Sequence, residues 1–118
     1  MKKILIVDDN NVNIKILKLI LNEMNVELLY AKNGVEAIDI CKLNPDIPLV
    51  LMDIRMPIMS GDDAAAIIKG ENSTIKIFAI TAGCVKNLET DNENIFDEIF
   101  QIPFNFEHIK KKTKEILF

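Results

Sequence analysis

The segment Ile4-Leu5-Ile6-Val7-Asp8-Asp9-Asn10, residues 4–10, sets the pattern on which the rest of the chain is built. It begins with four consecutive apolar residues, which is typical of a strand that is buried on both faces of a sheet. Two carboxylates follow directly, and apolar side chains then recur at helical spacing. The segment therefore predicts a buried strand that ends in an acidic pair and leads into a helix.

The same alternation of apolar runs and amphipathic stretches continues along the chain. The apolar runs predict strands at residues 4–7, 26–30, 49–52, 75–80 and 98–102. Helices are expected between and after them, with the later ones at 34–43, 61–69, roughly 84–95 and 106–117. In the first helix, the residues expected to face the core are Val12, Ile16, Leu19 and Ile20. In the last helix, the expected apolar face consists of Phe106, Ile109, Thr113, Ile116 and Leu117.

Strands that alternate with helices at this spacing predict right-handed βαβ units and a parallel sheet covered on both faces. We expect an α/β fold of the doubly wound (βα)5 type, with a five-stranded sheet in the flavodoxin-like order 2-1-3-4-5. In such sheets, ligands bind beyond the carboxyl ends of the strands, at the switch point between strands 1 and 3 where the strand order reverses.

Size and composition indicate one ordinary globular domain. The 118 residues are 49% hydrophobic and 27% charged, and no linker or repeat interrupts them, so residues 1–118 are expected to form a single domain. The net charge of -4 argues against direct nucleic-acid binding. No apolar run is long enough for an export signal or a membrane span, so we expect a cytoplasmic protein without membrane contact. Cys41 and Cys84 lack metal-ligand spacing and are expected to be small apolar residues, buried or half-buried.

Four polar residues are expected at the carboxyl edge of this sheet. Asp8 and Asp9 follow the first strand, Asp53 ends the third and Thr81 ends the fourth. Because strands 1 and 3 would be neighbours, the three carboxylates should converge, which is unfavourable unless protons or a cation intervene. Oxygen ligands without a nearby thiol or histidine favour Mg²⁺. The simpler alternative is that these acids only cap helix N-termini, a role that Asp9 or Asn10 could fill alone.

Three motifs resemble the receiver domains of response regulators in two-component signalling. They are Ile4-Leu5-Ile6-Val7-Asp8-Asp9-Asn10, then Leu51-Met52-Asp53-Ile54-Arg55-Met56-Pro57-Ile58-Met59-Ser60-Gly61, then Ala79-Ile80-Thr81-Ala82. The middle motif is the most specific, and the resemblance extends along essentially the whole chain. Val7-Asp8-Asp9-Asn10 followed by Val12-Asn13 is also similar to the receivers attached to hybrid sensor kinases.

The resemblance implies a role for each site residue. Asp53 would accept the phosphoryl group, and Mg²⁺ would be held by Asp8, Asp9, Asp53 and the backbone carbonyl of Arg55. The hydroxyl of Thr81 would contact the phosphoryl group. The partner would be a histidine kinase or a histidine phosphotransfer protein. Such a chain is a signalling domain and not an enzyme, beyond its own phosphorylation and dephosphorylation.

Pro57 and Gly61 are expected to shape the loop that follows Asp53. Proline would fix one backbone dihedral, and glycine would permit a positive one just before the next helix. It is equally plausible that both are ordinary loop residues with no special role, since proline and glycine are common in loops.

The chain also departs from the family pattern at the fifth strand. Family members usually carry a lysine before the proline that follows this strand, but here Ile102 precedes Pro103. The aromatic residue three positions earlier is replaced by Ile99. The surface formed by the helix at about 84–95, the fifth strand and the last helix would be the face for a homodimer, and the acidic segment 89–98 puts that role in doubt. These changes predict that phosphorylation drives only a weakened conformational switch. The alternative is a degenerate receiver that binds other proteins without being phosphorylated.

Three further features receive less weight. A Mg²⁺-dependent phosphatase of the haloacid-dehalogenase type also has an aspartate after its first strand, but it needs a second acid two residues later. This chain has Asn10 at that position, so the sequence does not favour this class of enzyme. His108 stands alone beside a basic run and is expected to be a solvated helix residue. The run Lys110-Lys111-Lys112 is expected to be a solvated helix face and not a nucleic-acid contact.

Overall fold

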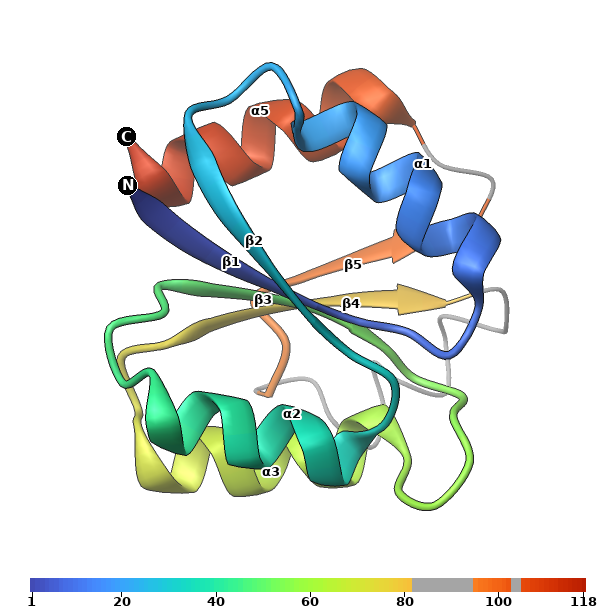
Figure 1. Ribbon diagram of the computed structural model, residues 1–118, viewed down its shortest axis with the longest axis vertical. Coiled ribbons are helices and arrows are strands. Elements are labelled where there is room, and N and C mark those ends of the chain that lie inside the picture. The colour runs from blue at the N-terminus through green and yellow to red at the C-terminus, as the bar shows by residue number, and fades with distance from the viewer. Residues whose placement is uncertain (82–94, 103–104) are drawn as a thin grey trace.

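The computed structural model describes residues 1–81, 95–102 and 105–118 of the chain, and Figure 1 shows its five-stranded parallel sheet. The strand order β2-β1-β3-β4-β5 confirms the order predicted from the sequence. The strands are β1 (Lys2–Val7), β2 (Val26–Ala31), β3 (Leu49–Asp53), β4 (Lys76–Thr81) and β5 (Glu98–Gln101).

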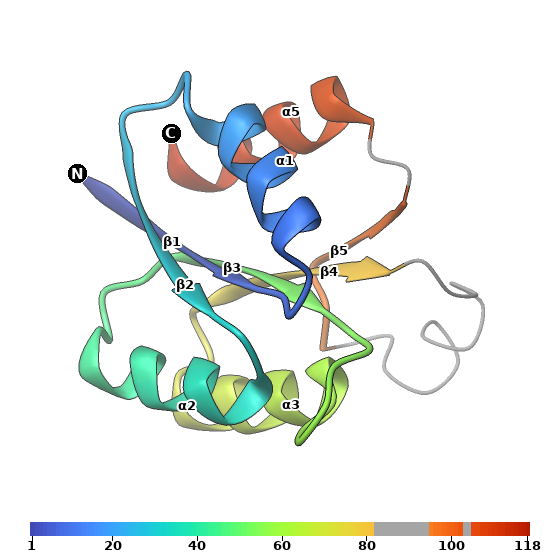
Figure 2. The ribbon, with the colours of Figure 1, turned by 45° about the vertical axis from the view of Figure 1, so that its right-hand side comes forward.

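Four helices cover the two faces of the sheet in the described part of the chain. They are α1 (Asn11–Leu21), α2 (Gly34–Leu43), α3 (Gly61–Glu71) and α5 (Phe106–Leu117). Figures 1 and 2 show α1 and α5 on one face and α2 and α3 on the other. None of the described helices is long and apolar enough to cross a membrane. The doubly wound α/β architecture expected from the alternation of strands and helices is therefore confirmed.

The central strands are buried because both of their faces are covered. In β1, Ile4, Leu5, Ile6 and Val7 are all buried, and in β3 the four residues before Asp53 are buried as well. Alternate residues of each strand enter different cores, since successive side chains point to opposite faces. Leu5 and Val7 pack under α2 and α3, whereas Ile4 and Ile6 pack under α1 and α5.

The buried face of α1 differs from the expected one. Leu17, Ile20 and Leu21 are buried, but Val12 and Leu19 are 63% and 73% exposed. The helix carries more apolar residues than one face can bury. At 100° per residue, Leu17 and Leu21 lie on the side opposite to Val12 and Leu19. The polar side chains of Asn11, Lys15, Lys18 and Asn22 are exposed.

The last helix agrees better with its predicted pattern. Ile109, Thr113 and Leu117 are buried and Ile116 is partly buried, but Phe106 in the first turn is 52% exposed. His108 is exposed and its ring lies edge-on to Phe100 at 5.1 Å between centroids, in keeping with a solvated helix residue. The helix expected at 84–95 falls almost wholly outside the described residues, and Ile95 itself lies in a turn.

Candidate functional site

The carboxyl edge of the sheet brings the predicted polar residues together. Val7 pairs with Met52, so the next residues, Asp8 and Asp53, reach the edge on neighbouring strands. Asp53 pairs with Ile80 on β4, and Thr81 directly follows Ile80. Asp53 and Thr81 are the last residues of β3 and β4, and Asp8 follows the last residue of β1. The register of three parallel strands thus places these residues at one edge.

Three carboxylates form a cluster at this edge. One oxygen each from Asp8, Asp9 and Asp53 can be chosen so that all three lie within 4.8 Å of one another. Asp8 is 1% exposed, and its Oδ2 is buried without a hydrogen-bond partner among the described residues. A buried carboxylate oxygen without a partner is costly. The all-oxygen donor set and this unsatisfied atom both fit a hard divalent cation.

The crowding of carboxylates changes their acidity. Burial, together with the neighbouring charge of Asp8, raises the pKa of Asp53 to about 7 against the lowering effect of the Arg55 N–H. Burial likewise raises the pKa of Asp8, while the N–H of Asn10 and the side chain of Asn13 lower it. Without a cation, these carboxylates therefore hold protons more tightly than isolated carboxylates do.

The start of α1 orients Asp8 and provides its own cap. The Asn10 N–H donates to Asp8 Oδ1 at 2.8 Å, and Asn10 Oδ1 accepts from the N–H groups of Val12 and Asn13. Asn10 is therefore the N-cap of α1. The view that the acids merely cap this helix is not supported, because Asn10 alone does so. Asn13 was missed as a neighbour of Asp8, although its place in the first turn after the cap was a signal for it.

The loop after Asp53 is tied to the site at both ends. The Arg55 N–H donates to Asp53 Oδ1 at 3.2 Å, and the Gly61 N–H donates to the carbonyl of Ile54 at 2.8 Å. A Cβ on Gly61 would overlap the carbonyl oxygen of Asp53 and lie 2.8 Å from the Cα of Ile54. The glycine is thus required for close approach of two backbones.

The expectation of a positive φ at Gly61 is wrong. No described glycine has a positive φ, and the loop instead places Ile58 at φ 72°. Glycine was the natural candidate because it adopts positive φ without steric cost. Nothing in the sequence pointed to a β-branched residue at this position.

The two residues expected to depart from the family pattern, Ile99 and Ile102, lie in or directly after β5, which pairs with β4. The N–H of Ile102 donates to the carbonyl of Thr81 at 2.9 Å, and its side chain packs partly buried against the core under α1 and α5. Ile99 packs against the core under α2 and α3, and Phe100 faces the opposite side, as expected for a strand. Pro103 lies outside the described residues, as does Cys84.

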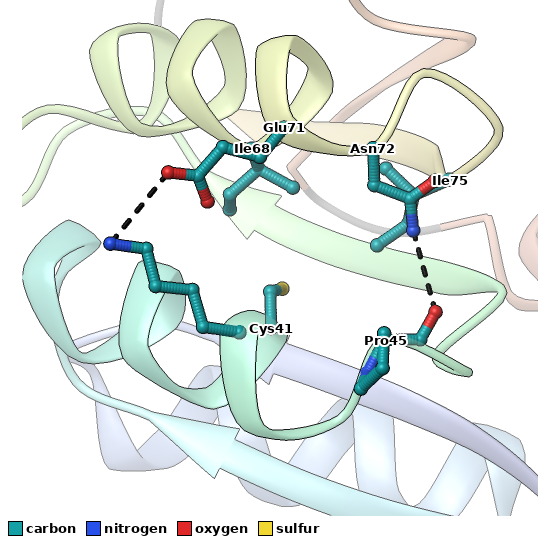
Figure 3. A pocket seen from close by; sticks show the side chains of 7 residues that line it. Cys41, Pro45, Ile68, Glu71, Asn72 and Ile75 are labelled. Atoms are coloured by element: carbon teal, nitrogen blue, oxygen red, sulfur yellow. Dashed lines mark hydrogen bonds and ion pairs between the residues drawn. The ribbon is translucent and has the colours of Figure 1, made fainter.

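A separate pocket of about 220 Å³ lies between the C-terminal ends of α2 and α3, as Figure 3 shows. Cys41, Ile68 and Ile75 line it, and the ion pair of Lys42 with Glu71, at 3.6 Å, crosses its rim. Cys41 is half-buried as expected, and burial raises the pKa of its thiol to about 11. The thiol is therefore poorly reactive at neutral pH, and the aspartate cluster remains the candidate for chemistry.

Comparisons with known proteins agree on the family. Residues 4–112 match the response regulator receiver domain. The chain is 38% identical over 78 residues to the autoinducer 1 sensor kinase/phosphatase LuxN of Vibrio harveyi, which covers 66% of the chain but 9% of LuxN. It is 32% identical to the hybrid signal transduction histidine kinase I of Dictyostelium discoideum, covering 88% of the chain and 6% of that protein. The chain therefore spans less than a tenth of the length of these two relatives.

Shorter relatives match over more of their own length. The polar-differentiation response regulator DivK of Brucella anthropi is 33% identical over 91 residues, 75% of the chain and 72% of DivK. Among solved structures, the response regulator TrrA of Thermotoga maritima, crystallised in complex with Mg(2+)-BeF, superposes with a TM-score of 0.86 at 34% identity, covering 98% of the chain and 99% of TrrA. Together with the strand order, these matches show that the chain belongs to the response regulator receiver domain family of two-component signalling.

Proposed function

We propose that residues 1–118 act as a single phosphoacceptor receiver domain, with Asp53 accepting the phosphoryl group in a Mg²⁺-dependent reaction. The observation that carries this proposal is the convergence of Asp8, Asp9 and Asp53 at the carboxyl edge of the sheet. A helix cap or a surface ion pair would not require three carboxylates in one place. A cation site next to a nucleophilic carboxylate does.

In this proposal each site residue has a defined role, and Asp53 and Arg55 each have two. Asp8, Asp9, Asp53 and the backbone carbonyl of Arg55 hold Mg²⁺, which supplies charge neutralisation around the crowded oxygens. A carboxylate oxygen of Asp53 attacks phosphorus while the bond from phosphorus to the donor atom breaks. The N–H of Arg55, 3.2 Å from Asp53 Oδ1, orients the carboxylate. The hydroxyl of Thr81, at the end of β4, contacts the transferred group.

The proposed partners follow from the family. Receiver domains interact with histidine kinases or histidine phosphotransfer proteins, so we place one of these as the donor, in the cytoplasm. A homodimer through the face that includes β5 and α5 is a further proposal. On that face Lys112 pairs with Glu98 at 3.2 Å within one chain.

A second candidate function is a protein-binding module that does not need phosphorylation. The observation that favours it is Ile102, whose apolar side chain packs, partly buried, against the core at the position where the family usually has a lysine. Charge-assisted hydrogen bonds contribute about 1.5–3 kcal/mol, and two functional states commonly differ by only a few kcal/mol. The absence of the lysine ammonium at position 102 therefore weakens the conformational switch between the unphosphorylated and phosphorylated states, even though the metal ligands are retained.

The test is phosphorylation by acetyl phosphate in the presence and absence of Mg²⁺, followed by intact mass. We expect a mass increase of one phosphoryl group in the parent chain with Mg²⁺, and none in Asp53→Asn. An equal increase in Asp53→Asn would overturn the assignment of the acceptor. A phosphorylated parent chain that persists for many minutes would favour the phosphoacceptor function over the phosphorylation-independent module.

A further inference from the structure

The loop between β3 and α3 contains a strained tight turn. The N–H of Met59 donates to the carbonyl of Pro57 at 2.8 Å, and the residue between them, Ile58, has a φ of 72°. These are the marks of a γ-turn with positive central φ, which is the rare and strained form. Isoleucine is among the least suitable residues for this position, because its branched Cβ crowds the backbone at positive φ.

The side chain of Ile58 also remains in water. It is 79% exposed, although it is a large apolar group. Glycine or asparagine would avoid both the backbone strain and the exposure of apolar surface. Neither cost brings any packing benefit within the chain, because the side chain is not part of either core. Strain of this kind points to a role outside the fold.

The position of Ile58 indicates what that role is. The turn lies on the loop that is tied to the site by the N–H of Arg55 at Asp53 and by the N–H of Gly61 at Ile54. The backbone therefore holds Ile58 in the same tied loop that begins at the acceptor, while its side chain stays exposed. A protein that carries a phosphohistidine would approach Asp53 over the carboxyl edge of the sheet, where this loop begins, whereas a small acyl phosphate need not touch the loop.

We propose that Ile58 is a specificity contact for the protein phosphodonor, which buries this side chain against its own apolar surface during transfer. The inference rests on the proposed function of Asp53 as acceptor. Burial of one isoleucine side chain on the donor strengthens the encounter on the order of tenfold or more. The turn fixes the backbone from which this exposed side chain projects.

The experiment compares two phosphodonors on the same variants. One is acetyl phosphate with Mg²⁺, and the other is the histidine kinase that phosphorylates the parent chain fastest in a panel purified from the same genome. The key variant is Ile58→Asn, since asparagine tolerates positive φ and removes the apolar group. Ile58→Val retains an apolar branched side chain. Leu43→Asn is the matched control, because Leu43 is 81% exposed and lies at the C-terminal end of α2, away from the acceptor.

We expect Ile58→Asn to lose roughly tenfold in the rate of transfer from the kinase, with an unchanged rate from acetyl phosphate and an equal or higher melting temperature. Ile58→Val should stay close to the parent, and Leu43→Asn should leave both rates unchanged. Unchanged kinase transfer in Ile58→Asn overturns the inference. An equal loss with both donors also overturns it, since Ile58 would then act through the geometry of the site.

Failure of the proposed function has a different result. If neither acetyl phosphate nor any kinase phosphorylates Asp53 in the parent chain, the acceptor function itself is wrong. If acetyl phosphate phosphorylates the parent chain and no kinase does, only the contact with a protein donor is overturned.

Discussion

Substitution of Gly61 by alanine should destabilise the protein by about 2–4 kcal/mol. The new Cβ would lie 2.8 Å from the Cα of Ile54 and 2.9 Å from the carbonyl carbon of Asp53. These are backbone atoms that cannot rotate away, so the N-terminus of α3 must move outward. Overpacking of this kind costs about 1–3 kcal/mol. The hydrogen bond from the Gly61 N–H to Ile54, 2.8 Å long, would weaken by about a further 1 kcal/mol.

The assay is urea unfolding together with thermal melting. For a chain of 118 residues, this loss of stability corresponds to a fall in melting temperature of about 8–16 °C. The slope of the unfolding free energy against urea concentration should be unchanged. Gly70→Ala is the matched control on the same helix, because its Cβ would meet nothing within 4 Å. That variant should gain about 0.5–1 kcal/mol, since alanine favours a helix interior over glycine. The reasoning is refuted if Gly61→Ala unfolds like the parent, or if Gly70→Ala loses as much as Gly61→Ala.

Three further predictions concern the site itself. Saturating Mg²⁺ should raise the melting temperature, because binding at a hundredfold excess over Kd stabilises the folded state by about 2.7 kcal/mol. In a thermal-shift measurement, Asp9→Ala should lose most of that rise. An undiminished rise would show that Asp9 is not a metal ligand. Without metal, burial and the charge of Asp8 raise the pKa of Asp53 from its ordinary value of 3.8 to about 7 in the folded chain. A raised carboxyl pKa stabilises the folded state below about pH 4, and this contribution is lost as the pH rises to about 7. The free energy of unfolding, measured with urea, should therefore fall more steeply between these pH values in the parent than in Asp53→Asn. Ile102→Lys should enlarge the chemical-shift changes that acetyl phosphate causes near Thr81 and Ile99, with melting measured in parallel; parent shifts that are already as large would contradict the weakened switch.

Sequence patterns were sufficient for the sheet because each strand carries its own signal. Unbroken apolar runs mark β1, β3 and β4 as buried strands, and right-handed crossovers leave few ways to order them. The convergence of Asp8, Asp9 and Asp53 then follows from strand order alone, since neighbouring parallel strands end at one edge.

Details that depend on three-dimensional neighbours could not be predicted in this way. The apolar residues of α1 exceed one helix face, and only contact with the sheet decides that Leu17 is buried and Leu19 is exposed. The role of Gly61 depends on a backbone crossing, which no local pattern reports. The positive φ of Ile58 runs against the preference of its own residue type.

The sheet separates two cores, one under α2 and α3 and one under α1 and α5, and no described residue contributes its side chain to both. Leu17 belongs to one core and Ile68 to the other, with the buried strands between them. Free-energy changes at sites that share no partners usually add within about 0.3–0.5 kcal/mol. The two faces are therefore energetically modular: substitutions can accumulate under one pair of helices without constraining which residues are tolerated under the other.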